Sequence, residues 1–140
     1  MKVKLMALLI TLCFALSLSS CFVTSRDTHV NLSYDEFSAN PTSIRNDFAL
    51  QVADKLYIEL CSNPSTGFKW SYTESISGIV KEEGYDYQEA GSDTVGAYGK
   101  ETWTFEGAKA GTTTISMEYS QPWEGGTKRE WTYTVNVKVK

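Results

Sequence analysis

From about residue 45 onward, apolar and polar side chains alternate in short runs with a period of two. The longest run ends the chain, where the apolar positions are Trp131, Tyr133, Val135, Val137 and Val139. Similar alternation occurs over residues 48–52, 56–60, 68–72, 102–105 and 114–119, and a more polar edge strand is expected over 79–89. Alternation of this kind indicates strands with one buried face. Because no helical pattern intervenes, we predict an all-β, antiparallel β-sandwich of about seven to eight strands.

The first 20 residues follow a different pattern. Lys2 and Lys4 precede an apolar run over residues 5–18, which is the layout of a secretory signal and is too short to span a bilayer comfortably. A buried helix of the domain is the alternative, but the run has no polar face. Its end, Leu18-Ser19-Ser20-Cys21, resembles the bacterial lipobox. That resemblance implies cleavage before Cys21 and lipidation of its thiol; ordinary secretion with Cys21 as a spare thiol is the other possibility.

These patterns divide the chain into three parts. We expect a lipoprotein signal peptide over 1–20, and a lipidated Cys21 with a tether and an N-terminal arm or extra strand over 21–44. The single folded domain is expected over 45–140, a length that suffices for one core. Within the middle part, residues 29–37 are either the extra strand or part of the arm, and a turn signal follows at Ser38-Ala39-Asn40-Pro41.

Charge and composition argue against several classes of function. The formal net charge is −4 and the basic residues are scattered, so nucleic acid is not an expected partner. His29 is the one histidine, and Cys61 is the one cysteine beyond the expected lipidation site. A catalytic dyad would need these two side chains to be adjacent, and a metal cluster would need more ligands. Cys61 lies on the outward phase of its strand. We therefore expect no enzyme, no metal, no cofactor and a monomer.

One connection between expected strands has the sequence Asn63-Pro64-Ser65-Thr66-Gly67-Phe68. Asn63 can form an Asx-type turn, Pro64 restricts φ, and Gly67 permits a positive φ. The hydroxyls of Ser65 and Thr66 should then lie at a stiff tip, which lowers the ordering cost of binding. The alternative is an ordinary strand connection, which uses the same residue types.

A second connection, about 60 residues later, reads Gln121-Pro122-Trp123-Glu124-Gly125-Gly126. Trp123 does not lie in any of the alternating segments. By contrast, Trp70, Trp103 and Trp131 occupy apolar positions of their strands and are predicted to lie in the core. Exposed tryptophans are enriched at interface hot spots. The alternative is an indole folded back over the sandwich edge. Between the two connections lies a third, Gly96-Ala97-Tyr98-Gly99.

Together, these loops resemble those of the chagasin-type inhibitors of papain-like cysteine proteases. That family carries an NPTTGF-like loop, a GxGG-like loop and an RPWE-like loop in this order. The resemblance covers residue 45 to the end and implies an immunoglobulin-like sandwich with the three loops at one end. It implies steric, reversible inhibition in which the first loop enters the active-site cleft. The protease-binding residues it implies are Asn63, Pro64, Ser65, Thr66, Gly67, Phe68, Gly96, Ala97, Tyr98, Gly99, Gln121, Pro122, Trp123 and Glu124.

The resemblance also implies roles and shows departures. Thr66 would contact the region of the protease's catalytic His, Ser65 that of its Cys, and Trp123 aromatic residues beside the cleft. Tyr98 stands where the family usually has Gly, so we expect a bulkier loop. Gln121 replaces the usual Arg and loses a charged group with five donors.

Two other functions stay open at this point. An aromatic-rich glycan- or ligand-binding envelope lipoprotein would use Trp123 and Tyr98 as stacking platforms, and it would require aromatic side chains in a row on a sheet face. A purely structural envelope protein would not need the stiff tip. For any of the three functions, the expected location is a membrane-anchored lipoprotein of the outer membrane or cell surface, with the periplasmic side also possible.

Overall fold

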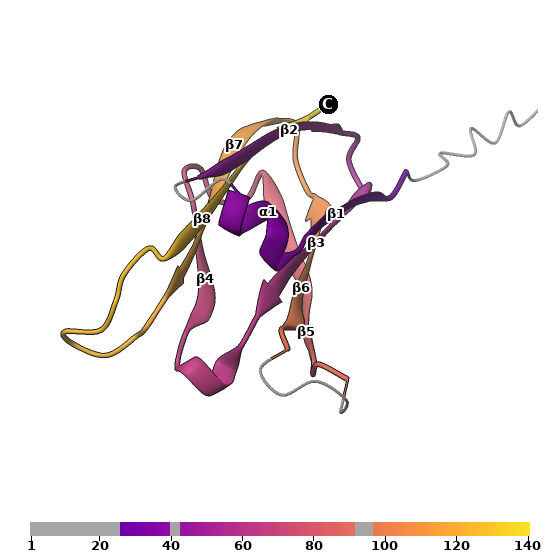
Figure 1. Cartoon of the computed structure of the whole chain (residues 1–140). Helices are drawn as coiled ribbons and strands as arrows, with labels where there is room; N and C mark the ends of the chain where they lie inside the picture. The colour runs from indigo at the N-terminus through magenta and orange to yellow at the C-terminus, as the bar shows by residue number, and fades with distance from the viewer. Residues whose placement is uncertain (1–25, 40–42, 92–96) are drawn as a thin grey trace, which may run out of the picture.

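The computed structural model describes residues 26–39, 43–91 and 97–140. Within these ranges, eight strands form two four-stranded sheets that pack face to face (Figure 1). The first sheet has the order β1 (Thr28–Leu32), β3 (Lys55–Ser62), β6 (Gly99–Gly107) and β5 (Val80–Gln88). The second has the order β2 (Ile44–Leu50), β8 (Trp131–Val139), β7 (Gly111–Ser120) and β4 (Lys69–Glu74). The predicted all-β sandwich of seven to eight strands is confirmed.

The core consists of the apolar phase of the central strands. In the second sheet, Ile115, Met117 and Tyr119 of β7 face Val135, Tyr133 and Trp131 of β8 in register. In the first sheet, Leu56 and Ile58 of β3 pair with Phe105 and Trp103 of β6. All of these side chains are buried, as are the indoles predicted for the core, Trp70, Trp103 and Trp131. Alternation along the sequence therefore identified the buried face correctly.

The expectation of wholly antiparallel sheets is wrong at two positions. Strand β1 pairs with β3 in parallel, and β2 pairs with β8 in parallel. The chain crosses from one sheet to the other between β1 and β2. Neither strand is therefore joined by a hairpin to the strand that it pairs with, and antiparallel pairing is not required. Alternation reports which face of a strand is buried and does not report the direction of the neighbouring strand.

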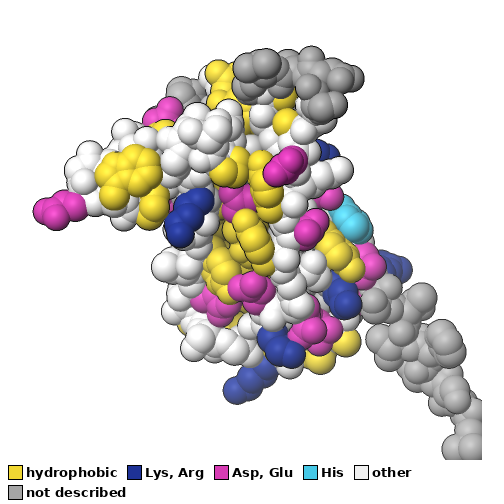
Figure 2. Space-filling view, turned by 90° about the horizontal axis from the view of Figure 1, so that it is seen from below, with side chains coloured by type: hydrophobic (Ala, Val, Ile, Leu, Met, Phe, Trp, Pro, Cys, Tyr) yellow, Lys and Arg dark blue, Asp and Glu magenta, His cyan; other side chains and the backbone are white. Residues whose placement is uncertain are grey.

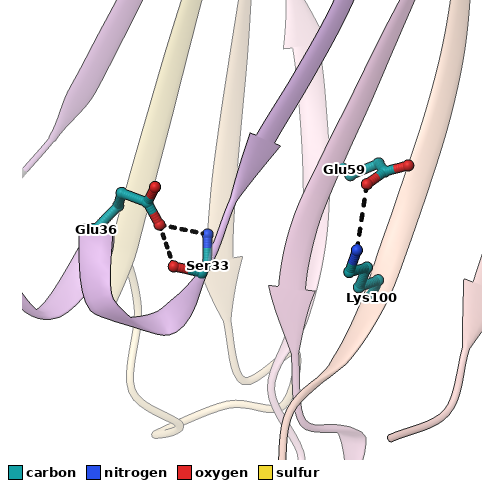
Figure 3. A network of polar contacts seen from close by, with 4 residues as sticks. All are labelled: Ser33, Glu36, Glu59 and Lys100. Atoms are coloured by element: carbon teal, nitrogen blue, oxygen red, sulfur yellow. Dashed lines mark hydrogen bonds and ion pairs between the residues drawn. The ribbon is translucent and has the colours of Figure 1, made fainter.

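The expected extra strand is present over Thr28–Leu32, but the residues after it form a short helix, α1 (Tyr34–Ala39). Ser33 starts this helix: its backbone N–H donates to a Glu36 carboxylate oxygen at 2.7 Å, and its hydroxyl donates to the same oxygen (Figure 3). The bond from the Ser33 N–H to Glu36 is one half of an S-x-x-E capping box, a helix signal that the strand interpretation overlooked. Asn40 and Pro41 of the predicted turn lie outside the described residues.

The strand directions bring the three predicted loops to one end of the sandwich. Strand β3 runs toward this end and β4 leaves it, and Ser62 pairs with Gly99 while Lys69 pairs with Ser120. The β3–β4 connection therefore lies beside both the start of β6 and the end of β7. In Figure 1 these connections are at the bottom, and the C-terminus is at the opposite end. The arrangement that the three-loop hypothesis requires is present for all of its described residues.

Candidate functional site: three loops at one end of the sandwich

The first loop is a single 3₁₀ turn over Pro64–Thr66, stabilised by its own hydrogen bonds. The Asn63 side-chain oxygen accepts from the Ser65 N–H at 3.2 Å and from the Ser65 hydroxyl at 2.5 Å. The Thr66 hydroxyl donates to the Asn63 carbonyl oxygen at 2.6 Å. Gly67 then reverses the chain with φ of 78°, a conformation that glycine adopts without strain. The predicted Asx-type turn and the positive φ are both confirmed.

These bonds determine what the tip can offer to a partner. Both hydroxyl hydrogens of Ser65 and Thr66 point into the loop, so their oxygens remain as exposed acceptors. The first loop therefore presents acceptors at a fixed position. The N–H groups of Ser65, Thr66 and Gly67 and both hydroxyl hydrogens are already used within the turn, a feature that the sequence did not reveal.

The base of the first loop rests on Tyr119 of β7. The Asn63 N–H donates to the Tyr119 hydroxyl at 2.8 Å, and the Phe68 ring stacks on the Tyr119 ring with a centroid distance of 5.2 Å. The Trp70 indole N–H donates to the Cys61 carbonyl oxygen at 2.9 Å, which joins the two strands below the loop. The alternation over residues 114–119 predicted a strand there and gave Tyr119 no role in the loop. Its contact with Asn63 spans 56 residues, and no local signal could have found it.

A buried carboxylate also supports this end. Glu101 of β6 is 3 % exposed, and its two oxygens accept from the Ser62 hydroxyl at 2.5 Å and the Tyr85 hydroxyl at 3.0 Å. Burial, together with the Glu101 carboxylate, raises the pKa of Tyr85 to about 12. The phenol therefore stays protonated and donates at neutral pH. Three adjacent strands, β3, β6 and β5, are joined immediately below the first loop.

The third loop, between β7 and β8, carries Trp123 with 49 % of its surface exposed. In Figure 1 this loop extends sideways from the sandwich, to the lower left of the view. A Cβ atom on Gly67 would lie 2.3 Å from Cη2 of Trp123, so the benzene ring of the indole lies directly against the glycine. The indole is neither inside the sandwich nor free in solvent. One part of it packs on the first loop and the rest is exposed.

Gln121 connects the third loop to the first. Its side-chain N–H donates to the Thr66 carbonyl oxygen at 3.2 Å, and its side-chain oxygen accepts from the Thr127 N–H at 2.9 Å. The Lys128 ammonium group donates to the Trp123 carbonyl oxygen at 3.0 Å and also to the Gln121 carbonyl oxygen. Pro122 and Glu124 are exposed on the same loop. The amide of Gln121 is therefore used within the protein and holds two loops together.

Of the second loop, Ala97, Tyr98 and Gly99 are described, and Gly96 lies outside the described residues. Tyr98 is half-buried, and its ring packs on Tyr34 of α1 with a centroid distance of 4.8 Å. The expectation of a bulkier loop therefore needs refinement, because the added ring packs on the protein itself. Gly99 is buried, and a Cβ there would lie 2.4 Å from the Gln88 carbonyl oxygen, so a larger residue does not fit.

Figure 2 looks directly at this end of the molecule. Hydrophobic side chains form one patch on the projecting lobe and a band across the centre, with separate acidic and basic side chains around them. Across 26–39, 43–91 and 97–140, no group of three or more His, Cys, Asp or Glu side chains is placed to hold a metal ion. The surface is suited to contact with another protein, because it combines exposed aromatic area with fixed hydrogen-bond acceptors.

Cys61 and His29 do not form a dyad. His29 pairs in register with Tyr57 and stacks on its ring at 4.5 Å, and Cys61 lies four residues farther along β3, about 13 Å away. Cys61 has the predicted outward phase but is buried, and it lines a pocket together with Leu32 and Tyr34 of the N-terminal segment. Burial raises the pKa of the Cys61 thiol to about 12, so it is not a nucleophile at neutral pH.

Fold and site thus define a sandwich that presents a rigid three-loop surface. The family model described as "Chagasin family peptidase inhibitor I42" matches residues 49–137. Chagasin from Trypanosoma cruzi is 30% identical over 104 residues, which cover 70% of this chain and 94% of chagasin. The chain belongs to the chagasin family of peptidase inhibitors, and it is an inhibitor rather than an enzyme.

Solved structures show the same fold. The cysteine protease inhibitor EhICP2 from Entamoeba histolytica has a TM-score of 0.63 at 24% identity, covering 82% of this chain and 98% of EhICP2. PbICP-C, solved in complex with falcipain-2, has a TM-score of 0.55 at 18% identity, covering 83% of this chain and all of PbICP-C (100%). The immunoglobulin-like sandwich is therefore confirmed.

Proposed function

We propose that this inhibitor acts reversibly on papain-like cysteine proteases by filling the active-site cleft with its three loops. The single observation that carries the proposal is the contact of the Trp123 indole with Gly67, which joins the tip and the exposed aromatic group into one surface. EhICP2 is a cysteine protease inhibitor, and PbICP-C was solved bound to falcipain-2. Both relatives support this target class.

The first loop is proposed to enter the cleft over the catalytic Cys and His of the protease. Thr66 would lie near the His and Ser65 near the Cys, each offering a hydroxyl oxygen as an acceptor. A 3₁₀ turn closed by its own hydrogen bonds does not present an extended peptide. The loop would therefore occupy the site without placing a carbonyl carbon in position for attack, and inhibition would be steric.

The other two loops would contact the two sides of the cleft. Residues 97–99 would lie on one side, with Gly96 as a further predicted contact outside the described residues. Trp123 would lie on the other side and pack on aromatic residues of the enzyme, as exposed tryptophans do at interfaces. Because Gln121 already bonds Thr66, we expect it to position the third loop rather than to bind a protease carboxylate.

The distribution of aromatic side chains favours this function over glycan binding. Among the described residues, the exposed large apolar side chains are Tyr34, Val52, Ile76, Tyr85 and Trp123, which lie on different elements and do not form a row. The outer face of the second sheet instead carries hydroxyl and other polar groups, including Ser71, Thr73, Ser116 and Thr134. A glycan platform would require stacked aromatic faces at such positions.

The test is a titration of the purified protein against papain, with trypsin as the control enzyme. We expect papain activity to fall to near zero at equimolar inhibitor and to return on dilution into substrate. Trypsin should be unaffected, because the three loops are proposed to fit the cleft of papain-like enzymes. Full papain activity at micromolar inhibitor would contradict the proposal.

We further propose that the protein is exported and held at a membrane by lipid on Cys21. Residues 1–25 lie outside the described part of the chain, so support comes from the charged and apolar segments and from the lipobox-like Leu18–Cys21 sequence. Along the described ranges, no helix is long and apolar enough to cross a bilayer. Cys21→Ser should release the protein from membranes in a fractionation experiment, and persistent association would count against lipidation.

A further inference from the structure

The N-terminal segment formed by β1 and α1 precedes residues 49–137, the range that the family model matches. It nevertheless reaches the loop end of the sandwich. The ring of Tyr34 stacks on the ring of Tyr98 with a centroid distance of 4.8 Å and an interplanar angle of 24°. Tyr98 directly precedes Gly99, which pairs with Ser62 at the start of the first loop. One helix outside the matched range thus contacts the second loop at its junction with the sheet.

We propose that Tyr34 is a positioning residue for inhibition: it holds Tyr98, and with it residues 97–99, in a fixed place relative to the first loop. Tyr34 need not touch the protease for this role. The inference deepens the proposed function and rests on it, because the position of the second loop matters only if that loop meets a partner. Order that exists before binding reduces the entropy lost on binding.

Tyr34 can act this way because α1 is itself held in place. Phe37, three residues later and on the same side of the helix, is 1% exposed. Its ring stacks on Trp131 at 5.1 Å with an interplanar angle of 13°, and it contacts Trp70 at 5.3 Å. Ser33 and Glu36 cap the start of the helix (Figure 3). The backbone that carries Tyr34 therefore cannot move away from Tyr98 unless Phe37 leaves the core.

The same aromatic group continues to the first loop. Tyr98 contacts Trp131 at 5.8 Å, and Trp131 stacks on Tyr119 at 4.9 Å with an interplanar angle of 8°. The Tyr119 hydroxyl accepts the hydrogen bond from the N–H of Asn63. A continuous series of contacts therefore joins α1, the second loop and the base of the first loop. These packed rings add to the β3–β6 pairing, which already places Gly99 beside Ser62.

Tyr34 and Phe37 differ in how much of each side chain is exposed, and this difference distinguishes their roles. Tyr34 is 44% exposed, so its loss removes little buried area, whereas Phe37 is a core side chain. The proposal also gives a reason for an aromatic residue at position 98, where the resemblance leads one to expect glycine. A tyrosine there has a partner in this chain, and that partner lies on the segment outside the family match.

The experiment compares Tyr34→Ala, Tyr34→Phe, Tyr98→Ala and the Tyr34→Ala/Tyr98→Ala double variant in the purified protein. Two quantities are measured: the inhibition constant for papain, and the amide hydrogen exchange of residues 97–99 in the free inhibitor. We expect Tyr34→Ala to weaken inhibition by about fivefold, within the range of a single aromatic pair. We also expect faster exchange at 97–99. Tyr34→Phe should behave as the unmodified protein, and the double variant should be no weaker than Tyr98→Ala alone.

Unchanged exchange at 97–99 in Tyr34→Ala would overturn the proposal, as would additive losses in the double variant. If Tyr34→Ala does not fold, Tyr34→Leu is used instead, because leucine retains apolar volume without the ring. The same two results would then overturn the proposal. The exchange measurement needs no protease. If no papain-like enzyme is inhibited, the proposed function fails, while exchange at 97–99 still tests whether Tyr34 positions the loop.

Discussion

The first and third loops lie side by side, but they are ordered by different means. The first loop is ordered by bonds among its own residues, with the Asn63 side chain accepting from Ser65 and the Asn63 carbonyl from Thr66. The third loop is longer and projects from the sandwich. Its exposed Trp123 packs on Gly67, and Gln121 bonds the Thr66 carbonyl oxygen. Part of the order of the third loop is therefore supplied by the first.

This difference shows how a small protein can present a large aromatic side chain without losing it to the core. A short turn with Pro and Gly can be rigid by itself, because few dihedral angles remain free. The longer connection that carries the exposed indole has many more free dihedral angles, and it needs an external support. In this protein the support is a glycine whose missing side chain leaves room for the indole. Variants that affect one loop or both can separate the two kinds of order.

The largest effect is expected from Gly67→Ala, which changes both loops at once. The new methyl group would lie 2.3 Å from Cη2 of Trp123, and the backbone at φ 78° costs a side-chain-bearing residue about 1–2 kcal/mol. We expect inhibition of papain to weaken by about 100-fold, since the indole is displaced and the tip is strained at the same time. The measurement is the inhibition constant, with the melting temperature recorded in parallel.

Gly78→Ala is the matched control for that variant. Gly78 has φ of 82°, but a Cβ there meets nothing within 4 Å, and the residue lies in the β4–β5 turn at the opposite end. It should lower the melting temperature to a similar degree and leave inhibition unchanged. Equal losses of inhibition in both variants would show that the contact with Trp123 is irrelevant.

Trp123→Ala should have the next largest effect, because it removes the exposed side chain and leaves the first loop with its own bonds intact. We expect a loss of about 2 kcal/mol in binding free energy, as for interface hot spots, with little change in melting temperature. Ile76→Ala is the control, since Ile76 is 55% exposed in the turn at the opposite end. An unchanged inhibition constant for Trp123→Ala would mean that the indole is not an anchor.

Gln121→Glu should have the smallest effect of the three. The substitution keeps an oxygen for the Thr127 N–H and removes the donor to the Thr66 carbonyl oxygen. Inhibition should weaken by about three- to fivefold, the contribution of one exposed hydrogen bond. In a Trp123→Ala background the same change should have almost no effect, because the loop then has no anchor to position. If Gln121→Glu weakens inhibition equally in both backgrounds, Gln121 does not act by positioning Trp123.

The sequence was informative wherever a local rule applied. Alternation located the strands and the buried indoles, and the residue types of Asn63–Gly67 predicted the turn that the structure contains. Two features went beyond local rules. Strand β1 pairs in parallel with β3, and β2 with β8, and these pairings depend on which sheet each strand joins. The pocket that Cys61 lines is formed partly by a segment about 30 residues earlier in the chain. The helix at 34–39 differs from these, because its capping box was visible in the sequence.

The sequence by itself determined the strand pattern, the stiffness of the first loop and the presence of a tryptophan in a loop, outside the alternating segments. These are properties of neighbouring residues, and steric and hydrogen-bonding preferences over a few bonds control them. The tertiary structure alone decided that Trp123 lies on Gly67, that Gln121 bonds Thr66 and that Tyr98 packs on Tyr34. Each of these contacts joins residues that lie far apart along the chain. Their formation depends on strand pairing within each sheet, because β4 pairs with β7, while β1 and β6 both pair with β3.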